Sequence, residues 1–591
     1  MRPHFLVASL AVLAACGGGT AVSTSGPAPR AGGSAAAVDA VITGAPRLTP
    51  EWGLAGRAKA TTGARAMVVS GHPLASEVGI EVLKQGGNAI DAAVAVGFAL
   101  EVVLPEAGNI GGGGFIVYRD TSARVRALDY REMAPAGASR DMYLDSAGHV
   151  TDQSPTGHLA SGVPGSVAGM YEAWKKYGRR PWATLVAPAI RLAEGHMLDG
   201  VRSRDLEAEA DRLRLFPASA RQFLVDGHAP PAGTMIRQPD LARTLRLIAD
   251  SGPDVFYRGQ IADSIVAEMQ RGHGLITKQD LADYRAKWRT PIQVTYRGYT
   301  VYSMPPASSG GVTMGEILNI LEGYDTLPAF GSAGYVHLET EAMRRAFMDR
   351  NHWLGDPDFV SMPLNRLLSK SYAAQLRAEI DPRKATPTPP FAAGGNEPLE
   401  TTHYSVVDAD GNAASVTTTL NGGFGSAVTV QGAGFLMNNE MDDFAAAPGQ
   451  PNMYGLVQGE ANAIAPKKRM LSAMTPSIVL DRDGKLFMVV GTPGGPTIIT
   501  SVFQVIVNVV DFKMSLADAV GAPRIHHQAL PDIIGYERNG LLPAVVDSLK
   551  AMGHEVRMRG GYSGDIAAIQ RVARGWVGVP DPRRGGGAAG W

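Results

Sequence analysis

The chain has 591 residues, of which 45% are hydrophobic and 19% charged, so it can bury a large core and is too apolar for global disorder. Lys and Arg total 55 against 56 Asp and Glu, which gives a net charge of -1. A protein without excess positive charge lacks the electrostatic surface that nucleic acid requires, so no nucleic-acid partner is expected.

The first residues have the pattern of a bacterial export signal. Arg2 gives a positive start, and Phe5 to Ala15 is apolar but too short to span a bilayer as a helix. The run ends in Leu13-Ala14-Ala15-Cys16, which resembles the lipobox of bacterial lipoproteins, and Cys16 is the only cysteine of the chain. The resemblance implies that this cysteine is acylated and becomes the mature N-terminus. An ordinary signal peptide with an incidental cysteine is the alternative.

On this interpretation residues 1–15 are a lipoprotein signal peptide, and residues 16–57, which are rich in Gly, Ala, Ser and Pro, form a flexible tether. The protein is then periplasmic and is held at a membrane, expected to be the outer membrane, only by the lipid on Cys16. No other run of the sequence is long and apolar enough to be a transmembrane helix.

The folded region is expected to begin near Ala58. Apolar periodicity and capping residues predict helices over residues 76–85, 88–103, 238–250, 260–271 and 315–321. Strand-like runs lie at 115–118 and 292–304. Residues 380–400 carry prolines and paired glycines that fit neither a helix interior nor a central strand, so they are predicted to be an exposed linker.

After this linker the pattern changes to short strands. They are predicted over residues 402–408, 413–420, 434–437, 477–480 and 486–490, and the first two are joined by the turn signal Asp410-Gly411. The chain thus divides into a mainly helical part, residues 58–400, and a β-rich part, residues 401–591. Composition alone would favour an ordinary two-domain protein with a surface loop between the domains.

Several common catalytic patterns are missing from the sequence. It has no Gly-x-Ser-x-Gly, Ser-x-x-Lys or His-Glu-x-x-His pattern, and its glycine clusters form no dinucleotide or Walker loop. The 13 histidines are scattered, and the adjacent His526-His527 would point to opposite faces of an extended segment. No metal and no cofactor are therefore predicted. With Cys16 at the anchor, the remaining nucleophiles are a hydroxyl group or water.

The segment from Glu400 to Asp408 resembles the start of the small subunit of γ-glutamyltransferases, which are N-terminal nucleophile hydrolases. Further blocks in the expected order extend the resemblance over nearly all of residues 58–591: GGNAIDAA (86–93), GNIGGGG (108–114), REMAP (131–135), SMPP (303–306), SSGG (308–311), NNEMDDF (438–444), LS (471–472) and PGG (493–495). This ordered set is specific to the family and its close acylase relatives.

The resemblance implies an α+β fold, a four-layer αββα sandwich shared between the two subunits that self-cleavage produces. The large and small subunits would form a heterodimer. It also implies that the precursor cuts itself between Glu400 and Thr401, when the Thr401 hydroxyl attacks the preceding carbonyl. A threonine hydroxyl needs a base. The α-amino group freed by the cut, with a pKa of about 7.7 to 8.0, can be that base.

The hairpin after Thr401 determines which side chains reach the nucleophile. A two-residue turn at Asp410-Gly411 would place Thr401 opposite Leu420, whereas a one-residue bulge would bring Thr419 or Asn421 to it. In the family, the position matching Thr419 hydrogen-bonds the nucleophile. The resemblance therefore predicts a bulge in this hairpin.

The resemblance also assigns the rest of the site. The oxyanion hole, which needs backbone N–H groups at a sharp turn, falls on Gly494 and Gly495. The positions that contact substrate fall on Arg131, Asn421, Glu440, Asp443, Ser472, Ala473 and Tyr454. The planar fork of an arginine suits the substrate's α-carboxylate, and buried carboxylates suit its α-ammonium. Tyr454 lies in a Pro/Gly-flanked loop, residues 448–459, and would act as a lid over the pocket.

One position departs from the family. Many members have two serines where this chain has Ser472-Ala473. The second serine usually adds a hydroxyl near the substrate carboxylate. Loss of a hydrogen bond to a charged group costs about 1.5 to 3 kcal/mol when nothing replaces it. The departure leaves catalysis intact and bears on how strongly a glutamyl group is recognised.

The sequence therefore predicts an enzyme that hydrolyses and transfers the γ-glutamyl group of glutathione and related γ-glutamyl amides. Water, amino acids or peptides would accept this group from a γ-glutamyl-threonine ester. One alternative is a related acylase for a glutaryl (cephalosporin) side chain or poly-γ-glutamate, and retention of Glu440 and Asp443 argues against it. The other is an uncleaved, inert envelope lipoprotein, against which the complete set of nucleophile and oxyanion residues argues.

Overall fold

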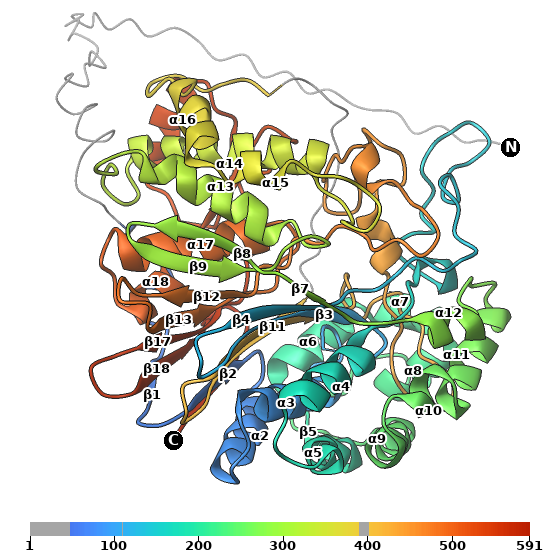
Figure 1. The fold of residues 1–591 in the computed structure, drawn as a ribbon. Coiled ribbons are helices and arrows are strands. Elements are labelled where there is room, and N and C mark those ends of the chain that lie inside the picture. Colours follow the sequence, from blue (N-terminus) through green and yellow to red (C-terminus); the bar gives the residue numbers. More distant parts are fainter. Residues whose placement is uncertain (1–47, 109, 389–400) are drawn as a thin grey trace, which may run out of the picture.

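The computed structural model describes residues 48–108, 110–388 and 401–591 (Figure 1). Cys16, Asn109 and Glu400 therefore lie outside the described residues, as do the predicted signal peptide, most of the tether and residues 389–400 of the predicted linker. Two seven-stranded sheets are stacked on one another, and helices cover the outer face of each sheet (Figure 1). The αββα sandwich expected from the resemblance is confirmed.

Both sheets combine strands from before and after Thr401. The first, here called the β10 sheet, has the order β19 (Gly587–Gly590), β2 (Met67–Ser70), β10 (Thr402–Val407), β11 (Ala413–Thr419), β3 (Gly113–Arg119), β4 (Val125–Tyr130) and β7 (Lys287–Arg289). The second, the β13 sheet, has the order β1 (Thr61–Gly63), β18 (Trp576–Pro580), β17 (Ala567–Arg571), β13 (Leu486–Val490), β12 (Ser477–Leu480), β9 (Tyr299–Ser303) and β8 (Ile292–Tyr296). Every strand pair within the two sheets is antiparallel.

The alternation of side chains along β10 separates two cores. Tyr404 and Val406 belong to the core between the β10 sheet and its helices, whereas Val407 belongs to the core between the sheets. Successive side chains of a strand point to opposite faces, so a single strand contributes to both cores. The space between the sheets also holds polar groups: the Ser405 hydroxyl donates to the Ala567 carbonyl of the opposite sheet at 2.9 Å.

The helices that cover the β10 sheet include α2 (Pro73–Lys84), α3 (Ala89–Val103), α4 (Ser166–Tyr177), α5 (Trp182–Glu194) and α9 (Pro239–Ser251). Every residue of α3 is buried, so this helix has no solvent-facing side. Its N-terminus is closed by a capping box between Asn88 and Asp91. The β13 sheet is covered by α13 (Gly310–Glu322), α14 (Ala333–Trp353) and α17 (Thr497–Val510).

Two expectations about local structure are wrong. Residues 434–437 form no strand but a single bridge, between Thr429 and Leu436, because residues 430–434 make a tight turn in which two successive N–H groups donate to the Val430 carbonyl. Residues 48–57, expected to be tether, pack on the domain. Trp52 and Leu54 are buried there, and the Trp52 indole N–H donates to the Gly521 carbonyl at 2.8 Å. The folded region thus begins before Ala58.

The described part of the predicted linker, residues 380–388, is held against α14 by hydrogen bonds. Residues 381–384 are exposed, as expected, but Ile380 is buried. The Asp381 carbonyl accepts from His337 at 2.7 Å, and the Thr386 N–H donates to Glu341 at 3.1 Å. The chain that leads towards Thr401 is therefore fixed as far as these contacts extend.

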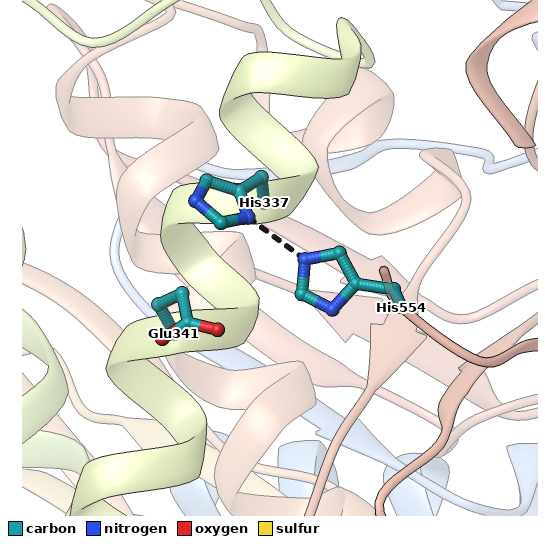
Figure 2. Close-up of side chains that lie close together, drawn as sticks. All are labelled: His337, Glu341 and His554. Carbon is teal, nitrogen blue, oxygen red and sulfur yellow. Dashed lines mark hydrogen bonds between the residues drawn. The ribbon is translucent and has the colours of Figure 1, made fainter. Parts of the chain in front are cut away.

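His337, Glu341 and His554 are close enough to suggest a metal site, since their ligand atoms lie within 4.8 Å of one another (Figure 2). Hydrogen bonds account for the cluster. Because His337 Nε2 donates to a carbonyl, its Nδ1 accepts from His554 Nε2 at 2.7 Å, which is shorter than the separation of roughly 3.3 Å that tetrahedral zinc geometry requires. Burial lowers the pKa of both histidines, that of His554 to about 3, so the pair is neutral.

Candidate active site

Thr401 directly precedes β10, an internal strand of the β10 sheet. Its side chain is buried, and its hydroxyl oxygen is 3.2 Å from that of Thr419, the last residue of β11. The ladder between the two strands pairs Thr402 with Thr418, so Thr401 and Thr419 come next in register. A two-residue turn would have paired Thr401 with Leu420 instead.

The shift in register arises in the turn between β10 and β11. The Asp408 N–H bonds to the Asn412 carbonyl at 3.0 Å, and the Gly411 N–H bonds to the Asp408 carbonyl at 3.1 Å. Gly411 has a φ of 85°, in the left-handed region. This is a three-residue loop with a glycine bulge. The bulge predicted for the hairpin is present and is located at Gly411.

Asn421 continues the chain from Thr419 in a left-handed conformation, with a φ of 77°. Its N–H donates to the Thr419 hydroxyl at 2.7 Å, and its side-chain amide donates to the Asn439 carbonyl at 3.0 Å. The Tyr454 hydroxyl donates to the side-chain oxygen of Asn421 at 2.6 Å. Thr419, Asn421 and Tyr454 thus form a connected wall beside the Thr401 hydroxyl.

The turn between β13 and α17 contributes Gly495 to the pocket that Thr401 lines. Gly494 and Gly495 have φ values of 130° and 52°. Their carbonyls accept from Thr497 and Ile498, at 3.0 and 3.1 Å, whereas neither of their N–H groups donates to any of the described residues. The positive end of the α17 dipole adds to these two donors. The arrangement suits an oxygen that acquires negative charge.

Arg131, which follows β4, occupies the centre of a buried cluster of carboxylates. Its two terminal nitrogens donate to Glu440 and Asp443, and Glu132 lies 3.6 Å away. Burial alone would lower the pKa of Arg131, but the three carboxylates outweigh burial and raise it. Burial raises the pKa of Glu440 and Asp443, although Arg131 opposes this. Arg131, expected to bind the α-carboxylate of a substrate, is therefore paired with Glu440 and Asp443, which are expected to bind its α-ammonium.

Three carboxylate oxygens in this cluster have no hydrogen-bond partner among the described residues: both oxygens of Glu132 and Oε2 of Glu440, all of them buried. Of these two residues, Glu440 lines the pocket. A buried carboxylate oxygen without a donor is costly, and an incoming ammonium group would satisfy it. Nearby, the Ser472 hydroxyl accepts from the Met474 N–H at 3.0 Å, and Ala473 contributes only a methyl group to the pocket wall.

A single pocket brings these groups together. In the described part of the chain, every predicted site residue except Gly494 lines it. Tyr454 is buried, and its ring lies beside Gly495, so closely that a Cβ added to the glycine would come within 2.9 Å of the ring. The predicted residues Cys16 and Glu400 lie outside the described residues.

Arg350 also lines the pocket, although nothing in the sequence marks it as a site residue. It lies near the end of α14, well before Thr401 in the chain. In the sequence it stands in Asp349-Arg350, which has the appearance of an ordinary charged pair on a helix surface. Only the packing of α14 reveals that this arginine is buried.

A buried threonine directly before a central strand of an αββα sandwich, in a pocket that a glycine turn also lines, is typical of the N-terminal nucleophile hydrolase class. The family model described as Gamma-glutamyltranspeptidase matches residues 75–591. The Glutathione hydrolase proenzyme of Escherichia coli (strain K12) is 47% identical over 526 residues, which cover 88% of this chain and 90% of that protein.

Acylases are also similar to this chain. The Acylase ACY 1 proenzyme of Pseudomonas sp. (strain SE83) is 39% identical over 520 residues, 86% of this chain and 90% of that protein. The crystal structure of a cephalosporin acylase from Bacillus halodurans superimposes with a TM-score of 0.81 at 30% identity, over 90% of this chain and 97% of that one. The chain belongs to the γ-glutamyltranspeptidase family and is an enzyme.

The hairpin register yields a test with a matched control. Gly411→Val places a β-branched residue at a φ of 85°, and the strain is relieved when the bulge is lost and Thr401 moves away from Thr419. We expect hydrolysis of γ-glutamyl-p-nitroanilide to fall at least tenfold. The control is Gly484→Val in the β12–β13 hairpin, where Gly484 has a φ of 75° and likewise no neighbour within 4 Å. Equal losses in both variants would contradict the role of the register.

Proposed function

We propose that this protein is a self-processing γ-glutamyl hydrolase and transferase that acts on glutathione and related γ-glutamyl amides. The observation that carries the proposal is a single buried pocket that combines the Thr401 hydroxyl, Gly495 of the glycine turn, and the charged set of Arg131, Glu440 and Asp443. The N–H groups of Gly494 and Gly495 in that turn donate to none of the described residues. The name of the relative in Escherichia coli, a glutathione hydrolase proenzyme, supports the substrate and the precursor form.

Processing is proposed to occur between Glu400 and Thr401, and gives a large subunit that ends at residue 400 and a small subunit of residues 401–591. The Thr401 hydroxyl attacks the carbonyl carbon of Glu400, and the C–N bond between the two residues breaks as the Thr401 nitrogen takes up a proton. Water then hydrolyses the resulting ester, which gives the Glu400 carboxylate and the free Thr401 hydroxyl. The two subunits stay together because β10 and β11 lie between β2 and β3 in one sheet. The new α-amino group, with a pKa of about 7.7 to 8.0 in a free N-terminus, supplies the base that Thr401 needs.

The proposed catalytic cycle uses the α-amine of Thr401 as the base and the backbone N–H groups of the glycine turn as hydrogen-bond donors. The α-amine accepts the hydroxyl proton of Thr401 while the oxygen attacks the γ-carbonyl carbon of the donor. The N–H groups of Gly494 and Gly495 stabilise the oxyanion, and the protonated amine returns its proton to the leaving amine. Water or the amine of an amino acid or peptide releases the γ-glutamyl group from the ester. These steps use no cofactor.

The paired cluster in the pocket favours a zwitterionic head group. A glutamyl donor brings an α-carboxylate for Arg131 and an α-ammonium for the carboxylates that it displaces, Glu440 and Asp443. A glutaryl donor brings only the carboxylate, so it leaves buried carboxylates without a cation. Each lost charged hydrogen bond costs about 1.5 to 3 kcal/mol. The pocket thus supports a glutamyl substrate over that of the related acylases.

Export and anchoring are proposed on the sequence alone. The structure contributes one finding: within the described residues, no helix combines the length and apolar character needed to cross a bilayer. We propose that the signal is removed before Cys16 and that this cysteine carries the lipid.

Cells grown with labelled palmitate should incorporate the label into the wild-type protein, and the Cys16→Ala variant should remain unlabelled. An unlabelled wild-type protein would exclude the anchor.

Thr401→Ala should abolish both processing and hydrolysis of γ-glutamyl-p-nitroanilide, because the same hydroxyl performs both reactions. Denaturing electrophoresis should show two bands for the wild type, the smaller beginning at Thr401, and one band for the variant. Thr418→Ala is a suitable control. Thr418 directly precedes Thr419 in β11, and its hydroxyl donates to the Gly113 carbonyl, so it has its own partner away from the nucleophile. A single band in the wild type would contradict the proposed mechanism.

Specificity provides a separate measurement. We expect kcat/KM for γ-glutamyl-p-nitroanilide to exceed that for glutaryl-p-nitroanilide by roughly ten- to a hundredfold. This ratio corresponds to the free energy of about one hydrogen bond to a charged group. Asp443→Asn should narrow this ratio, because it weakens the contact that only the glutamyl compound uses. A preference for the glutaryl compound would instead favour the acylase assignment.

A further inference from the structure

Two guanidinium groups line the pocket, and their partners differ in charge. Arg131 donates to the carboxylates of Glu440 and Asp443. Arg350 donates to neutral oxygens only: Ser309 Oγ at 3.0 Å, Asn351 Oδ1 at 2.9 Å and Gln458 Oε1 at 3.2 Å. Among the described residues no carboxylate comes within 4.0 Å of Arg350, the limit for an ion pair.

Arg350 is nevertheless deeply buried, with 1% of its surface exposed. Burial lowers its pKa to about 10, and the more distant Asp443 opposes this, so the group stays charged at neutral pH. A buried cation without an ion-pair partner is costly, because the Coulombic gain that normally offsets desolvation is missing. Such a group in a pocket is suited to an anion that arrives from solution.

The neighbours of Arg350 locate it within the pocket. Ser309, which accepts from Arg350, donates from its hydroxyl to the Ser472 carbonyl at 2.6 Å. Gln458, which also accepts from Arg350, donates to the Asp443 carbonyl at 3.0 Å. Arg350 therefore lies between Asp443 and the loop that carries Ser472 and Ala473, on the side of the pocket where the head group of the donor is proposed to bind.

We propose that Arg350 binds the α-carboxylate of the γ-glutamyl donor together with Arg131 and determines specificity for it. In this role Arg350 supplies the contact that the methyl group of Ala473 cannot make. The inference rests on the proposed γ-glutamyl function and adds a residue to its recognition site. With Arg350 nearby, the substrate carboxylate meets a second positive charge when it replaces Glu440 and Asp443 at Arg131.

The test compares two donors that differ only in the α-carboxylate: γ-glutamyl-p-nitroanilide and 4-aminobutyryl-p-nitroanilide. Arg350→Gln should raise KM for the γ-glutamyl compound at least tenfold, change kcat less than threefold and leave kcat/KM for the 4-aminobutyryl compound within twofold. Adding Ala473→Ser to Arg350→Gln should lower the raised KM for the γ-glutamyl compound at least threefold, because the serine hydroxyl then supplies a hydrogen-bond donor to the α-carboxylate.

Controls separate recognition from folding. Asn351→Ala removes one neutral partner of Arg350 and keeps its charge, so the ratio between the two donors should change less than twofold. Arg350→Lys keeps the charge without the planar fork, and its KM should lie between those of the wild type and Arg350→Gln. Conversion to two chains and the thermal midpoint report the integrity of each variant, and Arg350→Lys carries the comparison if Arg350→Gln is not processed.

The possible results distinguish this inference from the proposed function. An unchanged KM in Arg350→Gln, or an equal loss on both donors, would overturn the role of Arg350 while γ-glutamyl hydrolysis by the wild type remains. A wild-type enzyme that does not hydrolyse the γ-glutamyl compound would instead overturn the proposed function itself.

Discussion

One extra residue in a turn determines what meets the nucleophile. Gly411 adopts a left-handed conformation, and the added residue moves every pair of the β10–β11 ladder by one position. Thr419 consequently lies beside Thr401, and the Asn421 N–H orients the Thr419 hydroxyl. The Asp408 side chain supports the turn by accepting from the Asp410 and Asn412 N–H groups at 3.0 and 2.9 Å. The site thus depends on a turn at the far end of the strands.

Electrostatics constrains the other half of the pocket. Buried carboxylates surround Arg131, and burial raises the pKa of Glu132 to about 7 although Arg131 opposes the change. Such a cluster is stable only while its charges remain matched. A ligand that exchanges these contacts must therefore bring both signs of charge. The same constraint makes Arg350 conspicuous, because it is the pocket cation whose hydrogen-bond partners are all neutral.

Much of this arrangement could be predicted from the sequence. The helix expected over residues 260–271 matches α11 (Gln260–Arg271), and the strands expected over 477–480 and 486–490 match β12 and β13, because apolar periodicity and turn residues encode local structure. The αββα layers and the assignment of Thr401 as the nucleophile follow instead from the resemblance to a family. The location of the bulge and the buried position of Arg350 depend on packing between distant segments. The start of the fold is not evident from the sequence, because residues 48–57 show no helix or strand pattern and pack through only a few apolar side chains, Trp52 and Leu54 among them.

The strand order also has a consequence for the end of the chain that processing would expose. β10 lies between β2 and β11, and β2 pairs in turn with β19, so the strand that follows Thr401 is an internal strand of the β10 sheet. A cut before Thr401 would therefore create no new sheet edge and would leave the backbone pairs of β10 in place. The new N-terminus would be held by strands on both sides instead of fraying as a free end does.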